Sequence, residues 1–97
     1  MSSDKIIQIL TNSLFNKYRQ SIIALLRFIA NSGDKFPYTR EILHTFKSWE
    51  YYHKIIKICE ELGLIERFED YCWEGVKYRC KFARLTSLGY AVLNLFK

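Results

Sequence analysis

Residues 48–85 read SWEYYHKIIKICEELGLIERFEDYCWEGVKYRCKFARL, and this stretch decides the fold. Its first part repeats apolar residues at intervals of three and four, which predicts an amphipathic helix that Ser48 caps and Gly63 stops. Two segments rich in β-branched and aromatic residues follow, at 64–72 and 76–85, and the glycine between them suits a hairpin turn. The stretch therefore predicts a helix that leads into a two-stranded antiparallel hairpin.

Two helices are predicted before this stretch. Apolar spacing predicts a first helix over residues 4–14 and a second over 18–30, with residues that prefer caps and turns between them. A single bent helix is the alternative. The side chains of the first helix that we expect to point inward are Ile6, Ile7, Leu10 and Leu14.

A helix-turn-helix comes next. A short extended connector around Pro37 leads to a two-turn helix over residues 40–46, and the longer helix over 48–62 follows it. At the other end of the chain, Thr86 is expected to cap a last helix that ends at Lys97. The predicted fold class is α+β and mostly helical, with one domain over all 97 residues.

Positive charge is concentrated in the second arm of the hairpin. The chain has a net charge of +5, and residues 76–85 hold four basic residues and no acidic one. Strand alternation predicts that Lys77, Arg79 and Lys81 point outward and that the even-numbered side chains face the domain. Such a strip is typical of a surface that meets nucleic acid, and a solvated strand face is the plainer alternative.

The apolar content indicates a homodimer. Hydrophobic residues make up 49% of the chain and aromatic residues 16%, so we expect some of this surface to be buried against a second copy. The terminal helices, at 4–15 and 86–97, are the predicted contact. No apolar run approaches the ~20 residues that cross a bilayer, and the start lacks a signal-peptide pattern. We therefore expect a soluble, cytoplasmic protein that does not contact a membrane.

The three cysteines, Cys59, Cys72 and Cys80, form no Cys-x-x-Cys pair. Buried free thiols are the predicted state, because a turn at 73–75 pairs Cys72 with Val76 and leaves Cys80 too far away to bridge. A disulfide within the chain is the minor alternative. Metal-ligand spacing, phosphate loops and other catalytic motifs are all missing from the sequence. We therefore expect no metal, no cofactor and no enzymatic activity.

Three features together carry a resemblance to a known family: residues 59–67 (CEELGLIER), the Gly75 hairpin, and Leu85-Thr-Ser-Leu-Gly89 before the last helix. They resemble the winged helix-turn-helix transcription regulators of the MarR and PadR type, over roughly residues 18–97. The resemblance implies that residues 48–62 are a recognition helix, that the hairpin is a wing, and that the protein is a dimer. The small size and the Ile, Lys, Tyr and Phe bias are similar to those of regulators from thermophilic archaea and their viruses.

The resemblance implies sequence-specific binding of double-stranded DNA and regulation of transcription. A recognition helix turns its polar side to the major groove, where Lys54 and Lys57 would contact phosphate or guanine and Tyr51 a base edge. A wing would set Arg79 and Lys77 in or along the minor groove. The predicted DNA-binding residues are Thr39, Arg40, Ser48, Tyr51, His53, Lys54, Lys57, Lys77, Arg79 and Lys81.

The start of the predicted recognition helix departs from the family pattern. It opens with the bulky run Trp49-Glu-Tyr-Tyr52, where the family often has small residues. Glu50 would either repel phosphates or accept a hydrogen bond from a cytosine amino group. The aromatic residues also support an alternative function, a protein-interaction module that does not bind DNA. The residues that would form its surface are Trp49, Tyr51, Tyr71 and Trp73.

Overall fold

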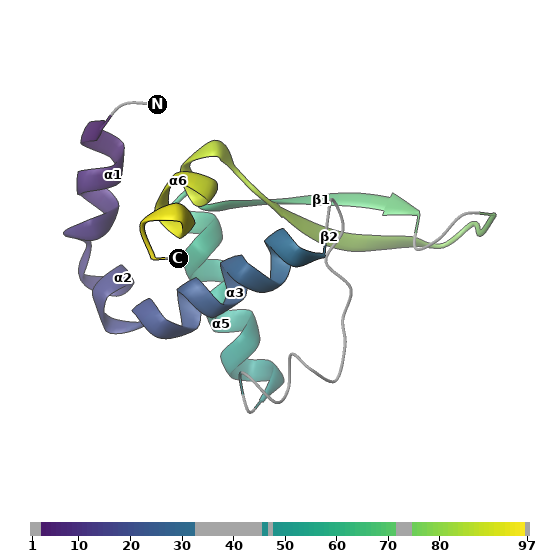
Figure 1. Cartoon of the computed structure of the whole chain (residues 1–97). Coiled ribbons are helices and arrows are strands. Elements are labelled where there is room, and N and C mark those ends of the chain that lie inside the picture. Colours follow the sequence, from purple (N-terminus) through teal and green to yellow (C-terminus); the bar gives the residue numbers. More distant parts are fainter. Residues whose placement is uncertain (1–2, 33–45, 47, 72–74, 97) are drawn as a thin grey trace.

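The computed structural model describes residues 3–32, 46, 48–71 and 75–96. The described chain is α+β and mostly helical, with a two-stranded antiparallel sheet (Figure 1). Its elements are α1 (Ser3–Leu10), α2 (Ser13–Lys17), α3 (Arg19–Asn31), α5 (Trp49–Glu61), β1 (Ile65–Tyr71), β2 (Arg79–Leu85) and α6 (Ser87–Leu95). Several predictions fall outside these residues: the connector around Pro37, the helix over 40–46 apart from Phe46, the helix end at Lys97, and the residues Thr39, Arg40, Cys72 and Trp73.

The predicted first helix, over 4–14, is in fact two helices. Asn12 separates them, because its side chain accepts hydrogen bonds from the amides of Leu14 at 2.9 Å and Phe15 at 3.1 Å and so caps α2. The new helix axis buries Phe15 and leaves Ile7 56% and Leu14 41% exposed. The prediction that Ile7 and Leu14 point inward is therefore wrong.

α3 and α5 pack against each other and supply most of the core. Both were predicted over nearly the same residues, at 18–30 and 48–62, and the structure confirms them. Phe46, which precedes α5 in the sequence, is also fully buried in this cluster. The buried side chains of the two helices are Ile22, Ile23, Leu25, Leu26 and Ile29 on α3 and Tyr52, Ile55, Ile56, Ile58 and Cys59 on α5.

Both ends of α5 follow from local chemistry. The Ser48 side chain accepts a hydrogen bond from the amide of Tyr51 at 3.1 Å, which satisfies one amide of the first turn. Gly63 follows the last turn with φ of 77°, a left-handed conformation that suits glycine. The amide of Leu64 then donates to the carbonyl of Cys59 at 2.9 Å and closes the helix end.

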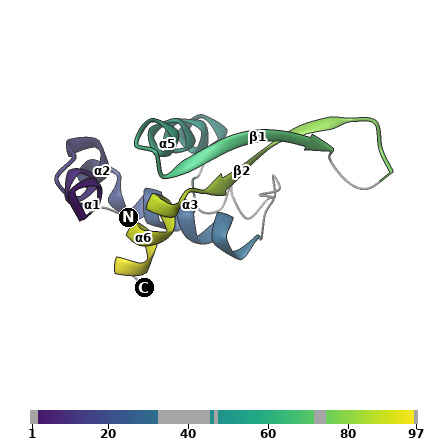
Figure 2. The same ribbon diagram turned by 90° about the horizontal axis from the view of Figure 1, so that it is seen from above.

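β1 and β2 form a hairpin that extends beyond the helices, as both views show (Figures 1 and 2). Its register pairs Ile65 with Leu85 at the base and Tyr71 with Arg79 toward the tip. The strands are shorter than the predicted 64–72 and 76–85, because residues 76–78 do not pair. Gly75 has φ of 84°, which confirms the prediction that the loop needs a glycine there.

The predicted alternation of the second arm is correct only in its middle. Lys81 is exposed and Phe82 is buried, as expected, but Ala83 is buried too and Arg84 is exposed. β2 contacts α3 and α6, and its buried residues lie toward its C-terminal end. Tyr78 is 72% exposed, although its even number predicted an inward side chain, and it lies before β2, outside the paired part of the hairpin.

The cysteines differ from the prediction of free thiols. Cys59 is a free thiol, and burial raises its pKa to about 12. Cys80 is disulfide-bonded, so the prediction is wrong at this residue. The error lies in the register: Cys80 pairs with Asp70, whereas the predicted turn places it opposite Phe68, two residues further from the tip.

Two of the three segments that carry the family resemblance, residues 59–67 and 85–89, are hydrogen-bonded to each other. The Thr86 side chain accepts a hydrogen bond from the Gly89 amide at 3.0 Å, which caps α6, and donates one to the Gly63 carbonyl at 2.6 Å. The Thr86 amide donates to the Leu64 carbonyl at 3.0 Å. A Cβ at Gly89 would lie 2.1 Å from that carbonyl oxygen, so only glycine fits there. This contact fixes the base of the hairpin to the start of α6.

Candidate nucleic-acid interface

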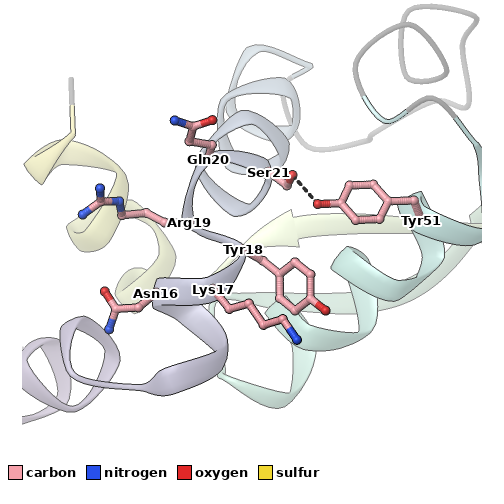
Figure 3. Close-up of a pocket in the computed structure, with 7 residues that line it drawn as sticks. All are labelled: Asn16, Lys17, Tyr18, Arg19, Gln20, Ser21 and Tyr51. Carbon is pink, nitrogen blue, oxygen red and sulfur yellow. Dashed lines mark hydrogen bonds between the residues drawn. The ribbon is translucent and has the colours of Figure 1, made fainter.

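Basic side chains gather at two places, the hairpin and the junction between α2 and α3. Lys17 ends α2 and Arg19 begins α3, and residues 5–33 contain no acidic residue. The N-terminal part of α5 passes this junction, and the two enclose a hollow of about 320 Å³ (Figure 3). The hollow is lined by Asn16, Lys17, Tyr18, Arg19, Gln20, Ser21 and Tyr51.

Tyr51 joins α5 to α3. Its hydroxyl lies 2.7 Å from the hydroxyl of Ser21, within hydrogen-bond distance, as the dashed line in Figure 3 shows. Its ring packs edge-on against Tyr18 at 6.3 Å between centroids and lies 6.2 Å from the ring of Phe46. The side chain is half-buried. The predicted base-contacting tyrosine therefore has a packing partner on each side and a hydrogen bond at its tip.

Two lysines meet at the ring of Tyr18. The ammonium of Lys54, on α5, lies 4.8 Å from the ring centroid, and that of Lys17, on α2, lies 5.4 Å from it. A hydrogen bond from Lys54 is the main cause that lowers the pKa of the Tyr18 phenol, with the charge of Lys17 adding to it. No ion pair joins either lysine to an acidic residue in the described part of the chain. We call Lys17, Tyr18 and Lys54 the junction cluster.

The remaining polar residues of α5 form its outer side. His53 and Lys57 are exposed and one helical turn apart, and Glu50 lies one turn before His53. The His53 ring packs edge-on against Tyr52 with 5.4 Å between centroids. Lys57 has no ion pair with a described acidic residue. The exposed side of α5 thus carries both charge signs, with Glu50 at its start, Lys57 further along, and Glu60 and Glu61 at its end.

The two arginines of β2 are held by groups on β1. Arg84 forms an ion pair and hydrogen bond with Glu66, its register partner. Arg79 donates to the Glu69 carbonyl at 3.2 Å, approaches the Glu69 carboxylate at 3.9 Å, and lies over the ring of Tyr71 at 5.6 Å. Both side chains are therefore engaged within the hairpin.

The acid-free strip of the sequence is not an acid-free surface. β1 and β2 together carry four basic and three acidic residues, and the register sets Glu66, Glu69 and Asp70 beside the basic strand. Lys77 and Lys81 are exposed and form no ion pair with the acidic residues that the structure describes. Within the predicted strip, these two lysines are the basic residues that could bind a partner without first breaking an ion pair with a described acidic residue.

The predicted site residues fall into separate groups. Lys54, Tyr51 and Ser48 lie on the first two turns of α5 near the α2–α3 junction, with His53 and Lys57 on the adjacent outer side. Lys77, Arg79 and Lys81 lie on the hairpin, whose tip points away from the helices (Figure 1). Thr39 and Arg40 lie outside the described residues.

Sequence reasoning missed the residues that α2 and α3 contribute. Neither Lys17 nor Tyr18 was among the predicted DNA-binding residues, and the helix expected over 18–30 had no predicted role in binding. The signal that points to them is the acid-free run from residue 5 to residue 33, which carries four basic residues. It marks a whole segment as basic, but it does not say that Lys17 and Lys54 share one ring.

Comparison of the chain with protein-family models, curated proteins and solved structures found no match. In the described part of the chain, no helix is long and apolar enough to span a membrane. The same residues contain no group of His, Cys, Asp or Glu side chains that could hold a metal ion. The candidate interface therefore depends on its own geometry and charge.

Proposed function

We propose that the protein is a homodimeric winged-helix regulator of transcription that binds double-stranded DNA. In this proposal α5 is the recognition helix and enters the major groove, and the hairpin is the wing. The observation that carries the proposal is the exposed side of α5. Lys54 and Lys57 lie there one turn apart, without ion pairs to any described acidic residue, on a helix whose opposite side is anchored in the core.

The residues of α5 would divide the work. Lys57 and His53 would face the base edges or the near phosphates, and Glu50 would select for a cytosine amino group at its position. Tyr51, with its ring packed and its hydroxyl beside Ser21, supports the position of the helix. Ser48 is used as the helix cap, and its own amide donates to the Phe46 carbonyl at 2.8 Å, so both groups are already bonded within the chain.

The hairpin supports the proposal through its lysines. Lys77 and Lys81 are the exposed cations without ion pairs, so they would contact phosphates along the groove. Arg79 would reach the minor groove only by leaving Glu69 and Tyr71. We therefore rank the two lysines before Arg79 as DNA contacts.

Exposed apolar side chains at the two ends of the chain support the homodimer. Ile7, Leu14, Tyr90 and Leu95 are exposed, and they lie on α1, α2 and α6, of which α1 and α6 contact each other. A second copy that covers them would remove apolar surface from water. Light scattering should give twice the 11.6 kDa of one chain, and a variant with Ile7→Glu and Leu95→Glu should return to the monomer mass. A wild-type protein of 11.6 kDa at micromolar concentration contradicts the homodimer.

Binding of a random pool of 20-bp duplexes, followed by selection, tests the DNA proposal. We expect affinity to fall steeply with salt, with a slope of log K against log salt of about −0.9 for each neutralised phosphate. Lys57→Ala should weaken binding, whereas Lys5→Ala, an exposed lysine on α1 with the same charge, should not. Failure to bind any duplex at low salt rejects the proposal.

Exposed aromatic side chains favour a second candidate function, a protein-interaction module. Tyr71 and Tyr78 on the hairpin and Trp49 at the start of α5 are all exposed. Aromatic residues are frequent at the centres of protein interfaces. Tyr78→Ala distinguishes the two candidates, because it leaves every cation in place. It should spare duplex binding if the hairpin works through its lysines.

A further inference from the structure

The junction cluster adds α2 and the start of α3 to the recognition helix and hairpin that the proposed function uses. Lys17 reaches Tyr18 from α2, and Lys54 reaches it from α5, so two elements far apart in the sequence bring their charges to one ring. Figure 3 shows the ammonium end of Lys17 and the hydroxyl of Tyr18 pointing the same way, while Arg19 points to the opposite side of the junction. The cluster therefore consists of two cations and one phenol.

The charges in this cluster are unbalanced. Each ammonium lies within 5.4 Å of the same centroid, so the two are no more than about 10 Å apart. Like charges at this separation repel each other, and a described acidic residue does not pair with either of them. Cation–π contact with Tyr18 attracts each lysine to the ring, but the two ammonium groups repel each other. A bound anion would attract both and offset this repulsion.

The donor set fits the oxygens of a phosphate. The two ammonium groups come from different elements, both lie within 5.4 Å of the Tyr18 ring centroid, and each can give a phosphate oxygen a strong, charge-assisted hydrogen bond. Both lysines are exposed, so an extended chain could pass over them. Closed, mostly apolar walls are typical of small-molecule sites, and the hollow beside the cluster is instead lined mainly by polar side chains.

We propose that Lys17 and Lys54, held together by Tyr18, clamp one backbone phosphate of the DNA strand that runs beside α5. The inference rests on the proposed function, and it adds α2 to the DNA-binding surface. Lys54 lies three residues before Lys57 on α5, so a strand whose groove admits the outer side of this helix would pass the junction cluster. Phosphate contacts of this kind set the register of a protein on the duplex without reading bases.

Salt titration of duplex binding with Lys17→Gln tests the clamp. The duplex is the tightest binder from the selected pool. We expect the slope of log K against log salt to become shallower by about 0.9, the value for one phosphate, and affinity near 0.1 M salt to fall on the order of three- to tenfold. Lys17→Arg keeps the charge and should retain the slope. The control is Lys5→Gln, which removes the same charge from an exposed site on α1 and should leave the slope unchanged.

The outcomes separate the clamp from the proposed function. If the wild type binds duplex and Lys17→Gln behaves like Lys5→Gln, the clamp is rejected and the DNA proposal stands. If the wild type binds no duplex, both are rejected. A free phosphorylated compound is the other source of the same chemistry, and inorganic phosphate at constant ionic strength is its probe. Saturable NMR shifts at Lys17 and Tyr18 with phosphate, together with an unchanged DNA slope, would overturn the assignment to the DNA backbone.

Discussion

The hairpin and the α2–α3 junction are both basic, but they hold their charges in opposite ways. The hairpin concentrates basic residues in β2. Glu66 and Glu69 of β1 bind the two arginines of β2, Arg84 and Arg79. The junction brings Lys17 and Lys54 to one aromatic ring with no described acidic partner. A basic stretch of sequence is thus a poor measure of the charge that a surface offers to a ligand.

The largest effect is expected at the base of the hairpin, where it is bonded to the start of α6. Gly89→Ala puts a methyl group 2.1 Å from the Leu64 carbonyl oxygen, so the start of α6 and the base of the hairpin must move apart. We expect a loss of about 1 to 3 kcal/mol in the free energy of unfolding, or more, because packed backbone cannot relax easily. Urea denaturation followed by circular dichroism measures it.

Gly75→Ala is the matched control for that change. Gly75 also has no side chain, but a Cβ there meets nothing within 4 Å, so the cost is the strain of φ at 84° alone. That strain is about 1–2 kcal/mol. An equal or larger effect at Gly75 would show that the hairpin loop, and not its base, is the anchored part.

Removal of the Tyr51 hydroxyl tests how firmly α5 is held at the junction. Tyr51→Phe deletes the hydrogen bond to Ser21 but keeps the ring contacts with Tyr18 and Phe46. We expect stability to fall by about 1 kcal/mol, the net value of an ordinary half-buried hydrogen bond. Ser21→Ala should cost a similar amount, and the double variant should cost less than the two together. Additive losses would show that the hydroxyls act independently.

Removal of an acidic partner should make the hairpin more like the junction. Glu69→Gln releases Arg79 from its carboxylate, so duplex binding should strengthen by up to about fivefold at low salt, since exposed pairs are worth 0.2–1 kcal/mol. Asp4→Asn makes the same charge change on α1, outside the hairpin and α5, and serves as the control. Equal gains in the two variants would mean that net charge, and not the release of Arg79, is responsible.

The smallest effect is expected in the titration of Tyr18. Its pKa is lowered mainly by Lys54 and less by Lys17, so Lys54→Gln should raise that pKa further than Lys17→Gln does. A lowered pKa favours the ionised phenol in the folded state. The contribution to stability is therefore present above the unfolded value near 10 and is lost as the pH falls through the folded pKa. NMR titration of the tyrosine ring carbons measures the shift. An unchanged Tyr18 pKa in Lys54→Gln would contradict the contact between Lys54 and Tyr18.

Local signals predicted α3, α5 and α6 well because each depends on neighbours in the sequence. Ser48 and Thr86 are caps that bond to amides three residues on, and Gly63 and Gly75 adopt the left-handed backbone expected of them. The same reasoning failed at Asn12, which it treated as an interruption but not as the cap of a separate helix. That error reversed the predicted burial of Ile7 and Leu14.

The candidate site was predicted less completely, since it depends on pairs of residues far apart in the sequence. The register, set by the whole hairpin, decides that Arg84 faces Glu66 and that Cys80 faces Asp70. The meeting of Lys17 with Lys54 spans two helices and cannot be read from the periodicity of either. Tyr78 lies before β2, outside the paired part of the hairpin, and is exposed although strand alternation predicted an inward side chain.

The helix caps, the turns at Gly63 and Gly75, and the succession of α5 and the hairpin could be predicted from the sequence. These features depend on hydrogen bonds and backbone preferences that act over a few residues. Only the tertiary structure decided which charges are paired. It placed Glu66 opposite Arg84 and Glu69 within reach of Arg79, and it left Lys17 and Lys54 together without a described acidic partner. The physical reason is that Coulomb interactions depend on distance in space, and distance in space is fixed by packing.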